Sequence, residues 1–203
     1  MVNIAVFVSG GGTNLQALID AEKAGFLKSG TIRLVVSGNP HAYALTRAEK
    51  EGIDAVVINR AVCESQEDFE AGISEALERS EIDMIVLAGF MTILSGDFTS
   101  KWPERILNIH PSLIPAFCGK GYYGLKVHEA VIASGVKTTG ATVHFVNEVP
   151  DGGKILLQKE VEVLPGDTPE TLQRRVMEQA EWKLLPQAVE MTAERIGKEK
   201  DAR

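Results

Sequence analysis

The chain has 203 residues, of which 44% are hydrophobic and 24% charged, and its formal net charge is −7. This length allows one domain with a sizeable buried core, and the composition is ordinary for a globular protein. The acidic balance argues against nonspecific binding to nucleic acid or to anionic membranes, and no apolar segment is long enough to span a bilayer.

The first half of the chain alternates short apolar runs with amphipathic stretches. We expect strands at residues 2–8, 32–36, 55–58, 82–88 and 106–109. Helices are expected to begin after the glycines at 10–12, at Asn39-Pro40, and at Ser65, where Asp68 completes a capping-box-like start. This alternation predicts a three-layer α/β fold, in which a mostly parallel, doubly wound sheet carries helices on both faces.

The pattern changes after residue 137. Residues 138–147 and 155–163 are each long enough for an extended strand, and the turn residues at 150–153 lie between them. This arrangement predicts a C-terminal antiparallel hairpin. From Leu172 to Ala188 an apolar residue recurs every four positions, which predicts a long terminal helix. Pro186 should kink or restart that helix, because proline has no N–H to bond the carbonyl of residue 182.

The glycine-rich loop after the first strand reads Ser9-Gly-Gly-Gly-Thr-Asn14 and leads into a helix. Glycines let the backbone approach a ligand, and the free N–H groups of a helix's first turn favour an anion. The dinucleotide fingerprint fails, because Leu15 occupies the position of its third glycine and no acidic residue ends the second strand. The loop is therefore either a plain strand-to-helix turn or a phosphate site, and three glycines in a row favour the phosphate site.

Asn108 and His110 lie two residues apart at the end of the fifth predicted strand. Side chains at this spacing project from the same face of a strand. Pro111 cannot donate to a sheet ladder, so strand pairing should stop just past His110. An amide can donate to a developing oxyanion, and an imidazole can transfer a proton near neutral pH. The residue types alone also allow a capped strand end with a satisfied histidine.

Other polar residues have ordinary structural explanations when each is considered alone. Asp151 lies in a Pro-Asp-Gly turn, His144 lies on a predicted strand, and Glu181 would by default face solvent on a helix. Cys63 and Cys118 are far apart and lack a metal-ligand spacing, so we expect reduced thiols and no metal site. The cytoplasm is the expected location. His41 and His128 fall on predicted helices and receive no role.

Several segments together resemble the phosphoribosylglycinamide formyltransferase family, the folate-dependent formyltransferases of purine synthesis. The resemblance covers nearly the whole chain, in the expected order. The matching segments are residues 9–18 (SGGGTNLQAL), 87–91 (LAGFM), 108–115 (NIHPSLIP), 139–146 (TGATVHFV), 151–153 (DGG) and 181–186 (EWKLLP). The histidine segment marks the wider formyltransferase superfamily, whereas the first loop combined with this chain length is more specific.

The resemblance implies transfer of a formyl group from 10-formyltetrahydrofolate to the amine of glycinamide ribonucleotide, by direct attack and without a covalent enzyme intermediate. It also implies a role for each matching position. The implied catalytic residues are Asn108, His110 and Asp151. The implied substrate-binding residues are Gly12, Thr13 and Asn14, which hold the phosphate, and Glu181, which binds the ribose hydroxyls. The implied folate pocket is formed by Met91, Thr92, Ile93, Leu94, Asn108, Asn147, Val149 and Asp151. A cis Ile114-Pro115 bond is a further implication.

The same resemblance suggests a single formyltransferase domain over residues 1–203. Residues 1–110 would form the nucleotide-binding half, and residues 111–203 the folate-site loop, the hairpin and the terminal helix. The expected partners are the two small-molecule substrates, with 10-formyltetrahydrofolate as cosubstrate, and not nucleic acid, a membrane or a metal. The protein is expected to be a monomer or a homodimer.

The chain departs from the family pattern at a few positions. Thr92 and Gln66 stand where relatives often carry arginine, which should weaken capture of the folate's glutamate tail. Glu178 adds a negative charge near the expected phosphate. The segment 117–124 is longer than expected after the histidine motif, and its Lys120 would restore some positive charge.

Three alternatives stay open at this stage. A formyltetrahydrofolate hydrolase would use water in place of the amine, but relatives of that kind usually carry a second histidine where this chain has Pro111. A methionyl-tRNA formyltransferase is less favoured, because it needs another domain and a basic RNA-binding surface. A nucleotide- or folate-binding module without turnover is the third alternative, and Thr92 and Gln66 lend it some support.

Overall fold

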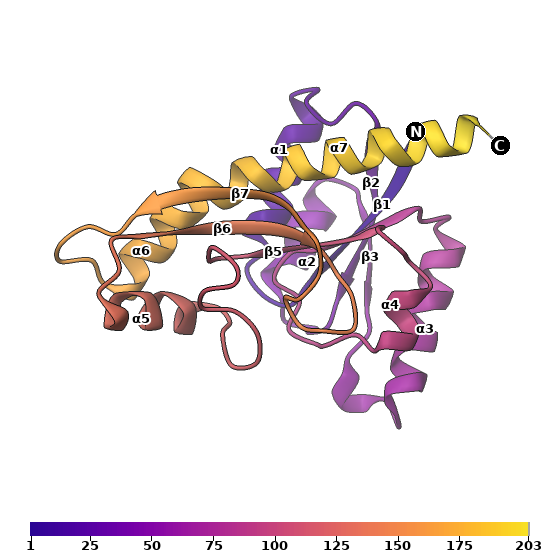
Figure 1. Cartoon of the computed structure of the whole chain (residues 1–203). Coiled ribbons are helices and arrows are strands. Elements are labelled where there is room, and N and C mark those ends of the chain that lie inside the picture. The colour runs from indigo at the N-terminus through magenta and orange to yellow at the C-terminus, as the bar shows by residue number, and fades with distance from the viewer. Residues whose placement is uncertain (203) are drawn as a thin grey trace.

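The computed structural model describes residues 1–202 and contains a seven-stranded sheet in the order β3-β2-β1-β4-β5-β6-β7 (Figure 1). The strands are β1 (Val2–Val8), β2 (Gly30–Ser37), β3 (Asp54–Val57), β4 (Met84–Leu87), β5 (Ile106–His110), β6 (Thr138–Phe145) and β7 (Ile155–Glu162). Pairing is parallel from β3 through β5 and antiparallel from β5 to β7. The predicted mostly parallel sheet with a C-terminal antiparallel hairpin is confirmed.

Helices cover both faces of this sheet. They are α1 (Thr13–Lys23), α2 (Tyr43–Lys50), α3 (Gln66–Arg79), α4 (Gly96–Ser100), α5 (Leu125–Ser134), α6 (Pro169–Val176) and α7 (Trp182–Asp201), with a 3₁₀ turn at Arg60–Val62 and a π-helical turn, η2, at Met177–Glu181. In Figure 1, α7 runs along one side of the sheet, whereas α3 and α4 lie on the other. The chain therefore has the three layers that the alternating pattern predicts.

The residues of β1 show why two separate cores form. Ile4 and Val6 pack into a cluster with apolar residues of α1, α6 and α7, whereas Ala5 and Phe7 pack into a second cluster with residues of α3 and α4. Successive strand residues point to opposite faces, so a strand that is apolar throughout must be covered on both. The sheet is thus buried, and its strand ends become the accessible place for a ligand.

The predicted start of the second helix was wrong. Asn39 does not cap a helix; its side-chain Oδ1 accepts the N–H of His41 at 2.9 Å, and its carbonyl accepts the N–H of Ala42 at 3.2 Å. Asparagine commonly bonds its own backbone in this way and forms a turn. The helix α2 consequently begins at Tyr43, and His41 lies outside it.

The terminal helix is interrupted by a π-turn that precedes Pro186. The helix α6 ends at Val176, the π-turn η2 follows, and α7 begins at Trp182. Pro186 lies inside α7 and has no N–H for the carbonyl of Trp182, so the first turn of α7 lacks one bond of the regular pattern. Single π-turns within helices are rare and often lie at functional sites.

Candidate active site

Asn108 and His110 lie on β5, between the parallel and the antiparallel part of the sheet. Asn108 is opposite Leu87 of β4, and pairing with β6 ends at His110, opposite Thr142. Strand pairing therefore stops where the proline predicts. His110 is 4% exposed, so its imidazole is almost fully enclosed at the carboxyl end of the strand.

Asp151 joins these two residues from the loop between β6 and β7. Its carboxylate lies 3.6 Å from His110 Nδ1 and 3.5 Å from His144 Nε2, and it accepts a hydrogen bond of 3.4 Å from Asn108 Nδ2. Asp151 has φ 55°, a left-handed conformation that is uncommon for residues other than glycine. The carboxylate thus does more than complete a turn, because it brings together side chains from β5 and β6.

The surroundings keep the Asp151 carboxylate charged. Burial would raise its pKa, but the hydrogen bond with His144, the charge of His110 and the N–H of Gly119 outweigh that effect, so the pKa is lowered from its ordinary value. The Gly119 N–H donates to Asp151 Oδ2 at 2.8 Å. A charged carboxylate therefore stands directly beside the imidazole.

The second imidazole nitrogen of His110 faces a backbone carbonyl. His110 Nε2 lies 2.9 Å from the carbonyl oxygen of Phe117, which can only accept a hydrogen bond. A ring with protons on both nitrogens satisfies this carbonyl and Asp151 together. Sequence reasoning missed Phe117 and Gly119, since both act through main-chain atoms that leave no side-chain signature. The Ile114–Pro115 bond just before them is cis, as the resemblance implied.

His144 is satisfied on both sides of its ring. Its Nδ1 donates to the carbonyl of Phe145 at 2.9 Å, and its Nε2 lies 3.1 Å from Asn108 Nδ2 and 3.5 Å from Asp151 Oδ1. This histidine consequently packs against both the Asn108 amide and the Asp151 carboxylate. His128 differs: it is fully buried on α5 with neither ring nitrogen paired within residues 1–202, and burial lowers its pKa to about 4.

The glycine loop presents N–H groups in one direction. The carbonyls of Ser9, Gly10 and Gly11 accept hydrogen bonds from Asn39, Ala44 and Arg47. In a planar trans peptide the N–H points opposite to the carbonyl, so the N–H groups of Gly11 and Gly12, which follow the two carbonyls bonded by α2, turn away from that helix. Gly12 then begins α1 with φ 69°, and a Cβ there would lie 2.6 Å from the Cβ of Ala44. The loop therefore requires glycine at residue 12 and forms a concavity suited to an anion.

Thr13, Asn14 and Glu181 connect the start of α1 to the π-turn. Asn14 Nδ2 donates to Glu181 Oε2 at 2.7 Å, and Thr13 Oγ1 donates to Met177 Sδ at 3.7 Å. Glu181 is 6% exposed, which corrects the default expectation of a solvated helical face. Burial raises its pKa to about 7, although the Asn14 bond opposes this rise. Glu178 instead forms an ion pair of 2.9 Å with Arg174.

The segment Met91–Leu94 follows β4 beside Asn108. Met91 is 57% and Ile93 65% exposed, whereas Leu94 is buried, so two large apolar side chains stand open at the carboxyl edge of the sheet. Thr92 lies near the Gly38 backbone, where its Oγ1 would be 3.7 Å from an added Cβ.

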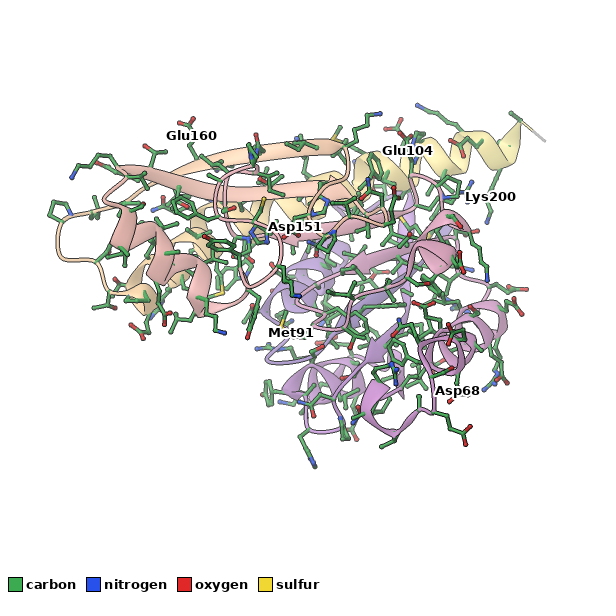
Figure 2. All side chains as sticks on the ribbon, turned by 60° about the horizontal axis from the view of Figure 1, so that its bottom comes forward. Asp68, Met91, Glu104, Asp151, Glu160 and Lys200 are labelled. Atoms are coloured by element: carbon green, nitrogen blue, oxygen red, sulfur yellow. The ribbon has the colours of Figure 1, made fainter. Side chains whose placement is uncertain are left out.

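The other predicted folate-pocket residues lie in the loop that ends at Asp151. Asn147 Oδ1 accepts the N–H of Val149 at 3.0 Å, and Val149 is half exposed. Figure 2 shows Asp151 near the centre of the molecule, whereas Lys200 lies at the far end of α7.

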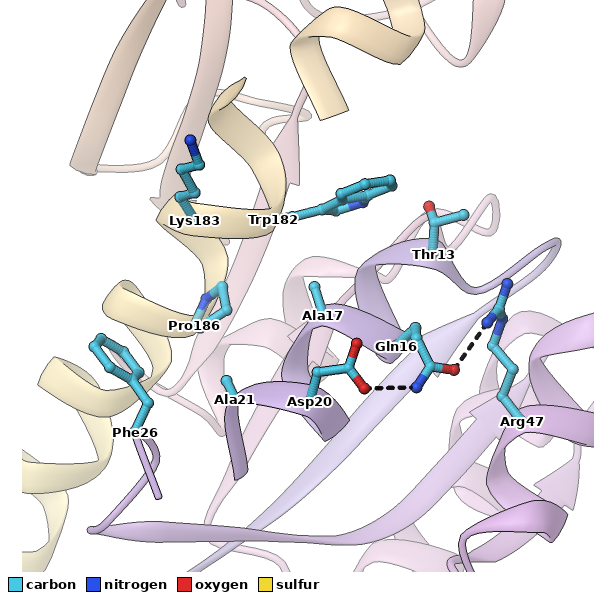
Figure 3. Close-up of a pocket in the computed structure, with 10 residues that line it drawn as sticks. All are labelled: Thr13, Gln16, Ala17, Asp20, Ala21, Phe26, Arg47, Trp182, Lys183 and Pro186. Carbon is cyan, nitrogen blue, oxygen red and sulfur yellow. Dashed lines mark hydrogen bonds between the residues drawn. The ribbon is translucent and has the colours of Figure 1, made fainter. Parts of the chain in front are cut away.

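A cavity of about 620 Å³ lies between α1 and α7, next to the glycine loop (Figure 3). Thr13 and Arg47 line the end near the loop, and Phe26 and Pro186 line the other part. Asn108, His110 and Asp151 do not line it, so this cavity is separate from the cluster of catalytic side-chain types. Residues 1–202 also contain no group of three or more His, Cys, Asp or Glu arranged to hold a metal ion, and no helix long and apolar enough to cross a membrane.

Comparison with known proteins gives concordant results. The sequence matches the formyl transferase family over residues 2–189. It is 40% identical over 194 residues to a phosphoribosylglycinamide formyltransferase from Haemophilus influenzae, a match that covers 96% of this chain and 88% of the relative. The fold is similar to glycinamide ribonucleotide transformylase 1 from Symbiobacterium toebii, with a TM-score of 0.89, 41% identity, and coverage of 96% of this chain and 89% of that one.

The chain is also similar to part of a larger protein. It is 45% identical over 190 residues to the trifunctional purine biosynthetic protein adenosine-3 of Bos taurus. That match covers 94% of this chain but only 18% of the relative's length.

Proposed function

Because this chain belongs to the formyl transferase family, and within it to the phosphoribosylglycinamide formyltransferases, we propose that it transfers a formyl group from 10-formyltetrahydrofolate to the amine of glycinamide ribonucleotide. The observation that carries this proposal is the convergence of an amide and an imidazole on one carboxylate, with Asn108 Nδ2 at 3.4 Å and His110 Nδ1 at 3.6 Å from Asp151. These are the groups that a direct acyl transfer needs, and they come from segments far apart in the sequence.

In the proposed reaction the amine nitrogen attacks the formyl carbon and forms a C–N bond. The formyl oxygen becomes an oxyanion, which Asn108 Nδ2 and a protonated His110 stabilise. Collapse of this intermediate breaks the bond to N10 of the folate as the protonated His110 donates a proton to that nitrogen, and the neutral imidazole then takes the proton that the amine loses. Asp151 faces His110 Nδ1 and holds the imidazole in place.

The glycine loop is the proposed site of the nucleotide's phosphate. The loop N–H groups that turn away from α2 and the open first turn of α1 favour an anion, even though the whole chain is acidic. We assign Gly12, Thr13 and Asn14 to the phosphate and Glu181 to the ribose hydroxyls. The bond between Asn14 and Glu181 supports this assignment, because it ties the ribose-side carboxylate to the phosphate loop.

The donor's pteridine is proposed to bind between two walls. One wall is the segment Met91–Leu94, with Thr92 and Ile93 inside it, and the other is the loop with Asn147, Val149 and Asp151. Open apolar side chains beside Asn108 support this placement, because a folate ring needs apolar contacts near the reacting carbonyl. Thr92 offers no charge to the glutamate tail, so tail length should have a small effect on donor affinity.

One assay tests the proposal against its rivals. The protein is mixed with 10-formyltetrahydrofolate, with and without glycinamide ribonucleotide, and tetrahydrofolate production is followed. Production that depends on the amine is expected. Production without the amine would identify a hydrolase, and no production in either mixture would leave a binding module; either result contradicts the proposal.

We keep the cytoplasm as the proposed location, since Cys63 and Cys118 are free thiols, as is usual there. The oligomeric state stays a prediction of monomer or homodimer.

A further inference from the structure

Glu70 is a buried carboxylate of α3 that the proposed mechanism does not use. It is 8% exposed, and within residues 1–202 it forms no ion pair with a lysine, arginine or histidine. A buried charge without a cation is costly unless hydrogen-bond donors satisfy it. Glu70 is satisfied in this way: it accepts from Ser95 N and Ser95 Oγ at 2.6 Å each and from Gln66 Nε2 at 2.7 Å.

These bonds hold one end of the segment Met91–Leu94. Ser95 is the residue directly after that segment, and it caps α4 by accepting the N–H of Phe98. Gln66, which bonds Glu70, also donates to the carbonyl of Ile93 at 3.2 Å. The other end is tied to the glycine loop, because the N–H of Met91 donates to Ser9 Oγ at 3.0 Å. The open apolar segment is therefore fixed by polar bonds at both ends.

The same carboxylate also supports the second wall of the proposed donor site. Gly96 follows Ser95 and packs so closely on the loop before β7 that an added Cβ would lie 3.2 Å from the Cβ of Glu148. Behind this contact, a cavity of about 280 Å³ lies between Thr99 and Ser100 of α4 and the segment 145–148. The N-terminus of α4 thus stands between Met91–Leu94 and the loop that ends in Asp151.

From these contacts we infer that Glu70 is a positioning residue for the formyl donor, setting the separation of the two walls that receive the folate. The inference rests on the proposed function, which assigns those walls to the donor. The acceptor loop touches the donor segment only through Ser9 Oγ, whereas its carbonyls are held by α2 and Asn39, which do not contact Glu70. Loss of Glu70 should therefore affect the two substrates unequally.

The chemistry of the site requires a carboxylate. The backbone N–H of Ser95 and the Nε2 of Gln66 can only donate, and a carboxylate is the side chain that accepts on both oxygens. A glutamine keeps one accepting oxygen, so it can still bind the N–H of Ser95. An alanine removes every acceptor and leaves the donors buried without partners.

The test compares Glu70→Ala, Glu70→Gln and a control, Glu75→Ala. Glu75 lies on the same helix but is exposed and pairs only with Arg79. We expect Glu70→Ala to raise the KM for 10-formyltetrahydrofolate by about tenfold or more, because a small shift of a positioning wall is costly. In the same Glu70→Ala variant the KM for glycinamide ribonucleotide should change by less than about twofold. Glu70→Gln should retain part of the donor affinity that Glu70→Ala loses. The control Glu75→Ala should match the wild type in both KM values.

A second readout separates this inference from the proposed function. Calorimetry measures the Kd of tetrahydrofolate for each variant, and thermal unfolding shows whether the variant is folded. If the wild type has no amine-dependent turnover, the proposed function fails and the tetrahydrofolate Kd still decides the role of Glu70. Three results would overturn the inference. They are a folded Glu70→Ala variant with unchanged donor KM and Kd, equal rises in the KM values of both substrates, and a wild-type protein that does not bind tetrahydrofolate. Should Glu70→Ala not fold, Glu70→Gln with wild-type donor affinity would overturn it.

Discussion

The two ends of the proposed active site are built in different ways. The glycine loop is a local structure, in which one strand, one turn and one helix provide backbone N–H groups, and α2 holds the turn through its carbonyls. The cluster around Asp151 is assembled over long distances from β5, β6, the loop before β7 and the loop after His110. The comparison indicates that the proposed anion site needs only a regular strand, turn and helix, whereas the proposed reaction site needs irregular segments held by one carboxylate.

The largest effect is expected at Asp151. Asparagine tolerates the left-handed backbone that this residue adopts, so Asp151→Asn should fold normally. It removes the charge that faces His110, and kcat should fall by about 10²–10⁴-fold. Steady-state kinetics and thermal unfolding check both parts of the prediction. If turnover stayed within about twofold, Asp151 would return to a turn-forming role.

A substitution in the glycine loop should lower the stability of the fold more than it lowers the rate of the reaction. Gly12→Ala forces a side chain into a left-handed conformation and against Ala44, which should lower the free energy of unfolding by about 2–5 kcal/mol. Gly11→Ala is the matched control, because nothing lies within 4 Å of an added Cβ there. Urea unfolding of both variants measures the difference. Equal stabilities would show that the loop is not held as described.

Glu181, which accepts a hydrogen bond from Asn14 of the glycine loop, should make stability depend on pH. Burial raises its pKa from 4.5 to about 7. Between these values the unfolded chain has released the proton that the folded chain keeps, so the free energy of unfolding falls as pH rises, by up to about 3 kcal/mol.

Glu181→Gln cannot titrate and should lack this contribution. Urea unfolding from pH 4.5 to pH 8 for wild type and variant isolates the difference, since the other titrating groups are shared. If the free energy of unfolding changed with pH in the same way for the wild type and for Glu181→Gln, Glu181 would not be a buried carboxyl that keeps its proton in the folded chain.

The smallest effect is expected at Cys118, although it adjoins the catalytic cluster. Its Sγ donates only to the carbonyl of Pro115 at 3.3 Å, and a serine hydroxyl can make the same bond. Cys118→Ser should therefore keep kcat within about twofold. Burial and then the charge of Asp151 raise the pKa of the thiol, so alkylation at pH 8 should be slower than that of a free thiol. A large loss of turnover in the serine variant would place sulfur chemistry in the site.

Much of the fold was predictable because its signals are local. The apolar runs of the strands, the glycines and the hairpin turn each depend on a few neighbouring residues, and all led to the observed sheet. The start of α2 was misplaced because Asn39 satisfies its own backbone in a turn. The π-turn escaped prediction because an apolar residue every four positions fits one continuous helix equally well.

The site was predictable only where side chains carry the function. Asn108 and His110 show their spacing in the sequence, and the resemblance added Asp151. Phe117 and Gly119 act through a carbonyl and an N–H, which any residue possesses. Glu70 looks like an ordinary charged residue beside the apolar stripe of α3, and only the fold shows that it is buried against Ser95.

The most direct measurement is a double-mutant comparison of turnover in His110→Ala, Asp151→Asn and the variant with both changes. If the imidazole and the carboxylate act together on one formyl group, the double variant should lose little more kcat/KM than the more severe single variant. If the two losses multiply, the residues act independently, and the proposed cluster is not the reaction centre.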